Sequence, residues 1–136
     1  MTELFCDTSY FVALLDPRDE LHSTAHELEE SIRNKQHCTS SAVLIETLNY
    51  FSRYSEPIRQ AAADFVGDIP KASGMCVIQV SRELQEAARM FFRKYSDKKY
   101  SATDCISMLI MRERGIKAVA TADEHFWQEG FEVLLG

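Results

Sequence analysis

The chain has 136 residues, close to the commonest length of one folded domain, and 46% of them are hydrophobic and 26% charged. This composition favours a packed core and excludes gross disorder. The formal net charge of −6 excludes a protein that holds nucleic acid through a broad basic surface, but it leaves room for a local basic strip or for bound metal ions.

Neither a signal peptide nor a membrane segment is predicted. Residues 1–3 lack the basic residues that begin a signal peptide, and Asp7 and Asp16 interrupt the first apolar run. No run approaches the ~20 apolar residues that cross a bilayer. We therefore expect a cytoplasmic protein that does not contact the membrane.

In the first half of the chain, short apolar runs alternate with helical patterns. ELFCD, residues 3–7, predicts a buried strand, and TSYFVALLD, residues 8–16, predicts a helix that ends before Pro17. A largely polar helix is predicted between residues 19 and 35, and a short strand at residues 37–40. The next helix, 40–54, is expected to bury one side, and another follows near 57–66. The predicted buried side comprises Val43, Leu44, Thr47, Leu48 and Phe51.

The second half continues the alternation. A strand is predicted at 75–80, and a helix over 81–95 with Ser81 as its N-cap. A helix over 102–115 ends at Gly115, and a strand at 117–121, a short helix at 123–130 and a final strand at 131–135 follow. The helix at 81–95 is expected to face inward with Leu84, Ala87, Ala88, Phe91, Phe92 and Tyr95. Such alternation predicts the α/β class: a three-layer α/β/α sandwich with a mainly parallel sheet of about five strands.

Four acidic residues fall at related points of this pattern. Asp7 and Asp123 each follow an apolar strand, Asp104 lies in the first turn of a helix, and Glu46 lies within the helix after the second strand. The carboxyl ends of parallel strands share one edge of a sheet, and ligands bind there near the point where the strand order reverses. We therefore expect Asp7 and Asp123 at one edge, with Asp104 and Glu46 close by.

Each acid also has a purely structural interpretation. Asp7 can cap a helix, Glu46 can be an ordinary flanking residue, and residues 101–104 and 121–124 have the spacing of capping boxes. These structural roles do not explain why four acids would gather at one edge, because two charges about 5 Å apart repel by roughly 3 kcal/mol at an effective dielectric near 20. A divalent cation removes that repulsion, and carboxylate and hydroxyl oxygens suit Mg²⁺ or Mn²⁺. His125, two residues past Asp123, can lean toward the same site, but a His-Phe pair here more often positions the turn.

The ordered segments resemble the PIN-domain family, and within it the VapC-type toxins of bacterial and archaeal toxin–antitoxin pairs. The segments that carry the resemblance are FCDTSYFVALL, TSSAVLIETLNYF, YSATDCISMLIMRERGI and AVATADEHFWQEGFEVL, spread over nearly the whole chain. The resemblance implies a single PIN-like domain over residues 1–136. It also implies that Asp7, Glu46, Asp104 and Asp123 are catalytic acids that hold one or two Mg²⁺ or Mn²⁺ ions, and that Thr121 with Ser9 or Thr8 supplies hydroxyls to the metal or to the acids.

The implied activity is metal-dependent hydrolysis of RNA phosphodiester bonds by activated water. One cation can lower the pKa of a bound water, and a second can stabilise the leaving oxygen. We expect products with a 5′-phosphate and a 3′-hydroxyl. The resemblance further implies a homodimer and a cognate antitoxin protein that silences the enzyme.

The segment RKYSDKKY, residues 93–100, is a candidate RNA contact because it combines four basic residues with two tyrosines. Phosphates favour lysine and arginine, and bases stack on tyrosine rings. The alternative is a solvated helix end whose cations complement the helix dipole. The candidate RNA-binding residues are Arg93, Lys94, Lys98, Lys99 and Tyr100.

Two other functions stay open at this point. A PIN nuclease that processes RNA as a housekeeping enzyme would have the same residues, and only a neighbouring antitoxin reading frame would separate it from a toxin. A non-catalytic module could use an acidic pocket to bind metal or a partner. The presence of all four acids favours an enzyme over that module.

Overall fold

The computed structural model describes residues 3–136 and contains the alternating elements that the sequence predicts. None of the described helices is long and apolar enough to cross a membrane. The elements in chain order are β1 (Glu3–Cys6), α1 (Thr8–Leu15), α2 (His22–Ser31), β2 (Gln36–Ser40), α3 (Ser41–Tyr50), α4 (Glu56–Asp68), the 3-10 helix η1 (Ile69–Lys71), β3 (Met75–Ile78), α5 (Arg82–Lys94), α6 (Ala102–Arg114), β4 (Ala118–Ala120), α7 (Glu124–Gln128) and β5 (Glu132–Val133).

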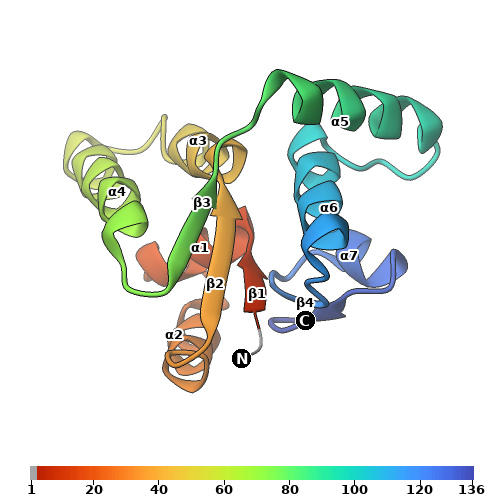
Figure 1. Cartoon of the computed structure of the whole chain (residues 1–136). Helices are drawn as coiled ribbons and strands as arrows, with labels where there is room; N and C mark the ends of the chain where they lie inside the picture. The colour runs from red at the N-terminus through yellow and green to blue at the C-terminus, as the bar shows by residue number, and fades with distance from the viewer. Residues whose placement is uncertain (1–2) are drawn as a thin grey trace.

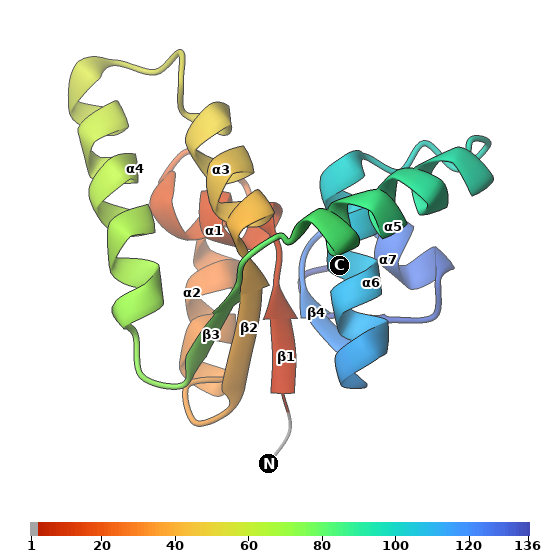
Figure 2. The same cartoon turned by 45° about the horizontal axis from the view of Figure 1, so that its top comes forward.

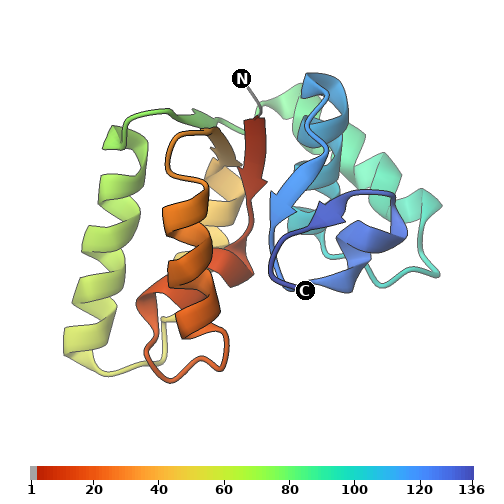
Figure 3. The ribbon, with the colours of Figure 1, turned by 90° about the horizontal axis from the view of Figure 1, so that it is seen from below.

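The strands form one five-stranded sheet in the order β3-β2-β1-β4-β5, and every neighbouring pair is parallel. Figures 1 and 2 show α1, α2 and α4 on one side of this sheet and α5, α6 and α7 on the other. Figure 3, seen from below, shows the same separation of α2 and α4 from α5 and α6. The predicted α/β sandwich with a parallel sheet is thereby confirmed.

The central strands are apolar because helices cover both of their faces. Phe5 of β1 and Val119 of β4 are register partners, and both are fully buried. α6 buries a continuous series of side chains against the sheet and ends at Gly115, whose φ of 69° is left-handed. Glycine adopts this conformation without a steric penalty, as the sequence predicts for a helix C-terminus.

The strand order reverses between β1 and β4, so the crevice expected of an open α/β sheet lies between their carboxyl ends. The N–H of Asp7 donates to the carbonyl of Ala120 at 3.1 Å, which extends the pairing one residue beyond β1. α3 contacts α6 and thereby brings Glu46 to the same edge. The fold thus gathers residues from four separate parts of the chain at one point.

Two helices expose apolar side chains that the periodicity predicted to be inside. Leu48 on α3 is 39% exposed, and Phe92 on α5 is 52% exposed, with Ala87 also at the surface. α5 packs chiefly on α6, and a single neighbouring helix covers only the narrow stripe that includes Ala88 and Phe91. The prediction of a wide buried face on α5 was therefore wrong. The elements also end earlier than predicted at Tyr50, Ile78 and Val133.

Candidate active site

A groove of about 560 Å³ opens at the carboxyl edge of the sheet, and all four sequence-predicted acids line it. The walls come from the N-terminus of α1, the loop between α1 and α2, the middle of α3, the loop before α6 and the start of α7. The polar side chains that line the groove are Asp7, Thr8, Ser9, Asp19, Glu20, Glu46, Tyr50, Lys99, Ser101, Asp104, Asp123 and His125.

Asp7 is the most deeply placed of the four acids, with 4% of its surface exposed. It occupies the N-cap position of α1, but its side chain makes no capping hydrogen bond, so capping does not explain the carboxylate. Its Oδ2 accepts a hydrogen bond from the Thr121 hydroxyl at 2.7 Å. Its Oδ1 is buried and has no hydrogen-bond partner in residues 3–136. A buried carboxylate oxygen without a donor is destabilising unless a cation meets it.

A relay of hydroxyl groups fixes the orientation of Asp7. The N–H of Ala122 donates to Ser9 Oγ at 3.0 Å, and Ser9 Oγ lies 2.9 Å from Thr121 Oγ1. Because the Thr121 proton is directed to Asp7, Ser9 is the donor to Thr121. The N–H of Asp123 also donates to Thr121 Oγ1, at 3.1 Å. With one proton given and two accepted, the Thr121 hydroxyl has its hydrogen-bonding capacity filled in this arrangement, and its proton orients the carboxylate of Asp7.

Burial raises the pKa of Asp7 to about 7. The hydrogen bond from the Thr121 hydroxyl and, more weakly, the nearby backbone N–H of Thr8 oppose this shift, whereas the negative charges of Asp104 and Glu46 add to it. The metal-free protein therefore keeps the Asp7 proton to a much higher pH than an exposed aspartate would. A cation that binds here has to displace that proton.

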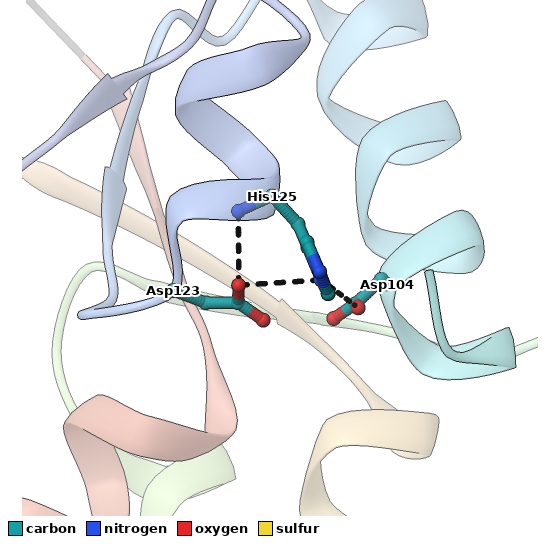
Figure 4. Close-up of side chains that lie close together, drawn as sticks. All are labelled: Asp104, Asp123 and His125. Carbon is teal, nitrogen blue, oxygen red and sulfur yellow. Dashed lines mark hydrogen bonds and ion pairs between the residues drawn. The ribbon is translucent and has the colours of Figure 1, made fainter. Parts of the chain in front are cut away.

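Asp104, Asp123 and His125 form a compact cluster in which one ligand atom from each residue lies within 4.8 Å of the others. Figure 4 shows the imidazole of His125 between the two carboxylates, with Nδ1 at 3.3 Å from Asp104 Oδ2 and 3.3 Å from Asp123 Oδ1. The sequence left two roles open for His125 and favoured the role in the turn over the position at the site that the structure shows. The sequence signal for a role at the site was the position of His125, two residues after Asp123. This position lies in the first turn of a helix whose N-terminus lies at the groove.

The helix-capping interpretations hold for two acids, and they fix the carboxylates in place. Asp104 forms the predicted capping box with Ser101: each backbone N–H donates to the other side chain, both at 3.0 Å. For α7 the N-cap is Asp123, not Thr121 as predicted, and its Oδ1 accepts from the N–H of His125 at 2.9 Å. The pKa of Asp104 is raised, chiefly by burial, and the charge of Asp123 adds to that shift.

Glu46 is held at the same groove from the other side. It is half-buried on α3, and its Oε1 accepts a 2.5 Å hydrogen bond from the hydroxyl of Thr8 at the start of α1. Thr8 thus donates a hydrogen bond to Glu46, while Thr121, itself hydrogen-bonded to Ser9, donates one to Asp7. Asp7 and Glu46 line the groove but lie outside the Asp104–Asp123–His125 cluster.

The candidate RNA-binding residues separate into two kinds. Arg93 and Lys94 end α5, Lys98 and Lys99 lie in the following loop, and all four are exposed. Tyr100 is only 4% exposed, and its hydroxyl donates to Glu129 Oε2 at 2.7 Å. The prediction that the Tyr100 ring is open to a base was wrong, because the loop turns this ring into the core.

A sequence model of the PIN domain matches residues 4–129. The chain is 30% identical over 128 residues to the 23S rRNA-specific endonuclease VapC20 of Mycobacterium tuberculosis, covering 94% of this chain and 95% of that protein. The crystal structure of VapC20, described as a Sarcin-Ricin loop cleaving toxin, matches with a TM-score of 0.84 over 94% of this chain and 95% of that one.

More distant structures share the fold. FitAcB from Neisseria gonorrhoeae matches with a TM-score of 0.70 at 14% identity, over 96% of this chain and 95% of that one. VapBC2 from Rickettsia felis, bound to a DNA fragment from its promoter, matches with a TM-score of 0.69 at 12% identity, over 97% of both chains. At such identities the likeness concerns the fold alone.

Proposed function

The chain belongs to the PIN-domain family, and from this premise we propose that it is a metal-dependent endoribonuclease and the toxin of a toxin–antitoxin pair. The relative that covers 94% of the chain at 30% identity is named as a 23S rRNA-specific endonuclease. The observation that carries the proposal is the buried carboxylate of Asp7, which has one oxygen without a hydrogen-bond partner in residues 3–136 and lines a groove together with the other three predicted acids.

The residues of the groove fit a divalent cation. Asp7, Asp104 and Asp123 would hold it, with Glu46 completing the set and His125 adjacent. Oxygen donors select hard cations such as Mg²⁺ or Mn²⁺, and the imidazole favours Mn²⁺ among them. One or two ions are compatible with four carboxylates. Such an ion, when bound, lowers the pKa of water and stabilises the negative charge of the leaving oxygen.

The surrounding residues contribute orientation and charge. The Ser9–Thr121 relay keeps Asp7 in one rotamer and favours its ionised form. Thr8 occupies one oxygen of Glu46, which leaves the other available to accept a hydrogen bond from an attacking water. Hydrolysis in this arrangement needs no side-chain nucleophile, and its products carry a 5′-phosphate and a 3′-hydroxyl.

A cleavage assay with matched variants tests the proposed function. Purified 23S ribosomal RNA and an unstructured RNA are incubated with Mn²⁺ or Mg²⁺, and with EDTA as the metal-free arm. In Asp104→Asn the amide oxygen can still accept from the N–H of Ser101, so the helix cap survives while the charge is lost. Cleavage should require metal and disappear in this variant. Asp64→Asn, at an exposed position on α4, is the control and should cleave normally.

Two results contradict the proposal. Cleavage that persists in EDTA would remove the metal from the reaction. Cleavage by Asp104→Asn at the wild-type rate would remove Asp104 from the site.

Exposed apolar side chains supply surface for protein partners. Ile45 on α3 is 59% exposed, and Met90 on α5 is 50% exposed, near in sequence to the exposed Leu48 and Phe92. Isolated apolar residues are ordinary at surfaces, but groups of them are typical of interfaces. We propose that these helices serve a homodimer contact and a cognate antitoxin. Ile45→Asp and Phe92→Asp should each shift the molar mass measured by light scattering toward the monomer if the dimer uses that helix; an unchanged dimer contradicts it.

Arg93, Lys94 and Lys98 are proposed as contacts to the RNA backbone outside the groove. Their exposure and their place in the segment that leads to Asp104 support this role. Each phosphate contact that is lost should flatten the slope of log affinity against log salt by about 0.7 for single-stranded RNA. Replacing Arg93 and Lys94 with alanine should therefore reduce the slope by about 1.4, and an unchanged slope would exclude them.

A further inference from the structure

Lys99 differs from the other basic residues near the site because it lines the acidic groove itself. It is the one lysine or arginine among the described residues of the groove wall, which also includes Asp7, Asp19, Glu20, Glu46, Asp104 and Asp123. The ion pairs formed within residues 3–136 involve Arg18, Arg89, Arg112, Arg114, His26 and His125, and Lys99 takes part in none of them. The ammonium group is thus available to a ligand.

The backbone at Lys99 adopts a conformation that is unfavourable for lysine. Its φ is 63°, and within residues 3–136 it is the one residue other than glycine with a positive φ. Side chains with a Cβ rarely adopt this left-handed conformation, and such strain persists only where the surroundings impose it. Glycine, asparagine or aspartate would be the favourable choice for a loop with no further requirement at this position.

The neighbours of Lys99 impose the conformation. On one side, the N–H of Lys98 closes a turn onto the carbonyl of Tyr95 at 2.9 Å. On the other side, Tyr100 is buried, and its hydroxyl donates a hydrogen bond to Glu129. The second carboxylate oxygen of Glu129 accepts a hydrogen bond from Arg112 Nη2 at 2.6 Å. The next residue, Ser101, is tied to Asp104 by the capping box. Lys99 is therefore positioned by the same helix N-terminus that positions one of the four acids.

We propose that Lys99 binds a non-bridging oxygen of the scissile phosphate and so acts as a catalytic residue, whereas Lys98, Arg93 and Lys94 bind RNA only outside the groove. This inference rests on the proposed function and extends it to one residue. A phosphodiester carries one negative charge, and a second develops as the attacking oxygen adds. A fixed ammonium group stabilises the more highly charged state more strongly, which raises the rate beyond its effect on binding. No proton transfer through Lys99 is required.

The first test separates rate from affinity. Single-turnover cleavage of 23S ribosomal RNA is measured with Mn²⁺ at saturating protein. Lys99→Ala should lower the saturating rate by about 100-fold, the range for loss of one group that stabilises developing charge. Lys98→Ala, at the adjacent proposed RNA contact, should weaken affinity more than it lowers the saturating rate. Equal effects of the two substitutions would overturn the proposal.

The strained backbone provides a second variant. Lys99→Gly removes both the side chain and the steric penalty at φ 63°, so its melting temperature should rise above that of Lys99→Ala while its cleavage rate stays equally low. Lys99→Arg should recover part of the rate. A Gly variant that cleaves like the wild type would show that the side chain has no role in the reaction.

The last test does not depend on cleavage. The affinity of a short ribo-oligonucleotide with a 5′-phosphate, which mimics the product end, is compared with that of the same oligonucleotide without it, in the presence of Mn²⁺. The wild type and Lys98→Ala should prefer the phosphorylated form, and Lys99→Ala should lose most of that preference. A preference that Lys99→Ala retains, or one that the wild type lacks, overturns the proposal.

These experiments distinguish failure of the proposed nuclease function from failure of the inference about Lys99. If the wild type cleaves no RNA with metal, the proposed function fails, and the phosphate preference still decides whether Lys99 binds phosphate. If Lys99→Ala binds Mn²⁺ more tightly but keeps its phosphate preference, Lys99 only offsets the charge of the acids, and the present inference is wrong.

Discussion

The hydroxyl of Thr121 donates a 2.7 Å hydrogen bond to Oδ2 of Asp7, although the two residues lie 114 positions apart in the chain. They meet because β1 and β4 are neighbours at the point where the strand order reverses. The bond occupies one oxygen of the carboxylate and leaves Oδ1 without a partner in the described chain. One oxygen of this carboxylate thus has a protein donor and the other has none, and the proposal that a cation binds the second oxygen leads to the expectations below.

Thr121→Val preserves the shape of the side chain but removes its hydrogen bonds. We expect the pKa of Asp7 to rise further, because the Thr121 bond lowers it, and the affinity for Mn²⁺ at pH 7 to fall about tenfold. Titration calorimetry measures the change. Thr121→Ser keeps the hydroxyl and should bind metal nearly as well as the wild type. If the valine variant also binds normally, the relay does not orient Asp7.

The metal-free protein should lose stability as the pH rises. The pKa of Asp7 is about 7 in the folded protein and near 4 in an unfolded chain, so between these values the folded state binds more protons. The unfolding free energy therefore decreases from about pH 4 to pH 7. Asp7→Asn should remove this decrease and be more stable than the wild type at pH 8 by roughly 1–3 kcal/mol, with little difference at pH 4. Urea unfolding in EDTA at the two pH values is the measurement; equal pH slopes would contradict it.

Metal affinity should rise over the same pH range. Below pH 7 the proton on Asp7 competes with the cation, which predicts an increase in affinity of up to about tenfold per pH unit, levelling off above pH 7. Calorimetry in buffers of different ionisation enthalpy counts the protons released. Release of close to one proton at pH 6 is expected, and binding without proton release would place the cation away from Asp7.

Glu46→Gln should remove the negative charge of the side chain while keeping the side chain in its position. The glutamine oxygen can still accept from the Thr8 hydroxyl, so the melting temperature should change little. Loss of the charge at the groove should lower the metal-dependent cleavage rate about 100-fold. Glu56→Gln, at an exposed position on α4, is the matched control. Cleavage by Glu46→Gln at the wild-type rate would show that the charge of Glu46 has no role in the reaction.

Tyr100→Phe tests the anchor of the loop before α6. The substitution deletes the hydroxyl that donates to Glu129, a hydrogen bond to a charged acceptor, and should lower the unfolding free energy by about 1–3 kcal/mol. Tyr95→Phe is the control, since its ring is only partly buried and the structure shows no hydrogen bond from its hydroxyl within residues 3–136. Equal stability of the two variants would mean that the Tyr100 hydroxyl does not anchor the loop.

The elements themselves were predictable because their signals are local. Apolar runs that end at Asp7 and Thr121 indicate buried strands, Ser101 and Asp104 have the spacing of a capping box, and Gly115 is the residue expected where α6 ends. The alternation of strands and helices then requires parallel pairing, since each connection crosses from one end of the sheet to the other.

The sequence alone determined which residues could carry the chemistry, namely four acids in order, each beside the end of a strand or the start of a helix. Only the tertiary structure decided what each one contacts: that Thr8 meets Glu46, that His125 lies between two carboxylates, and that one buried oxygen of Asp7 has no hydrogen-bond partner in the described chain. It also decided that Tyr100 is buried and Phe92 exposed. Periodicity defines the faces of an element, but burial depends on which distant element covers a face, and that relation is not written in the local sequence.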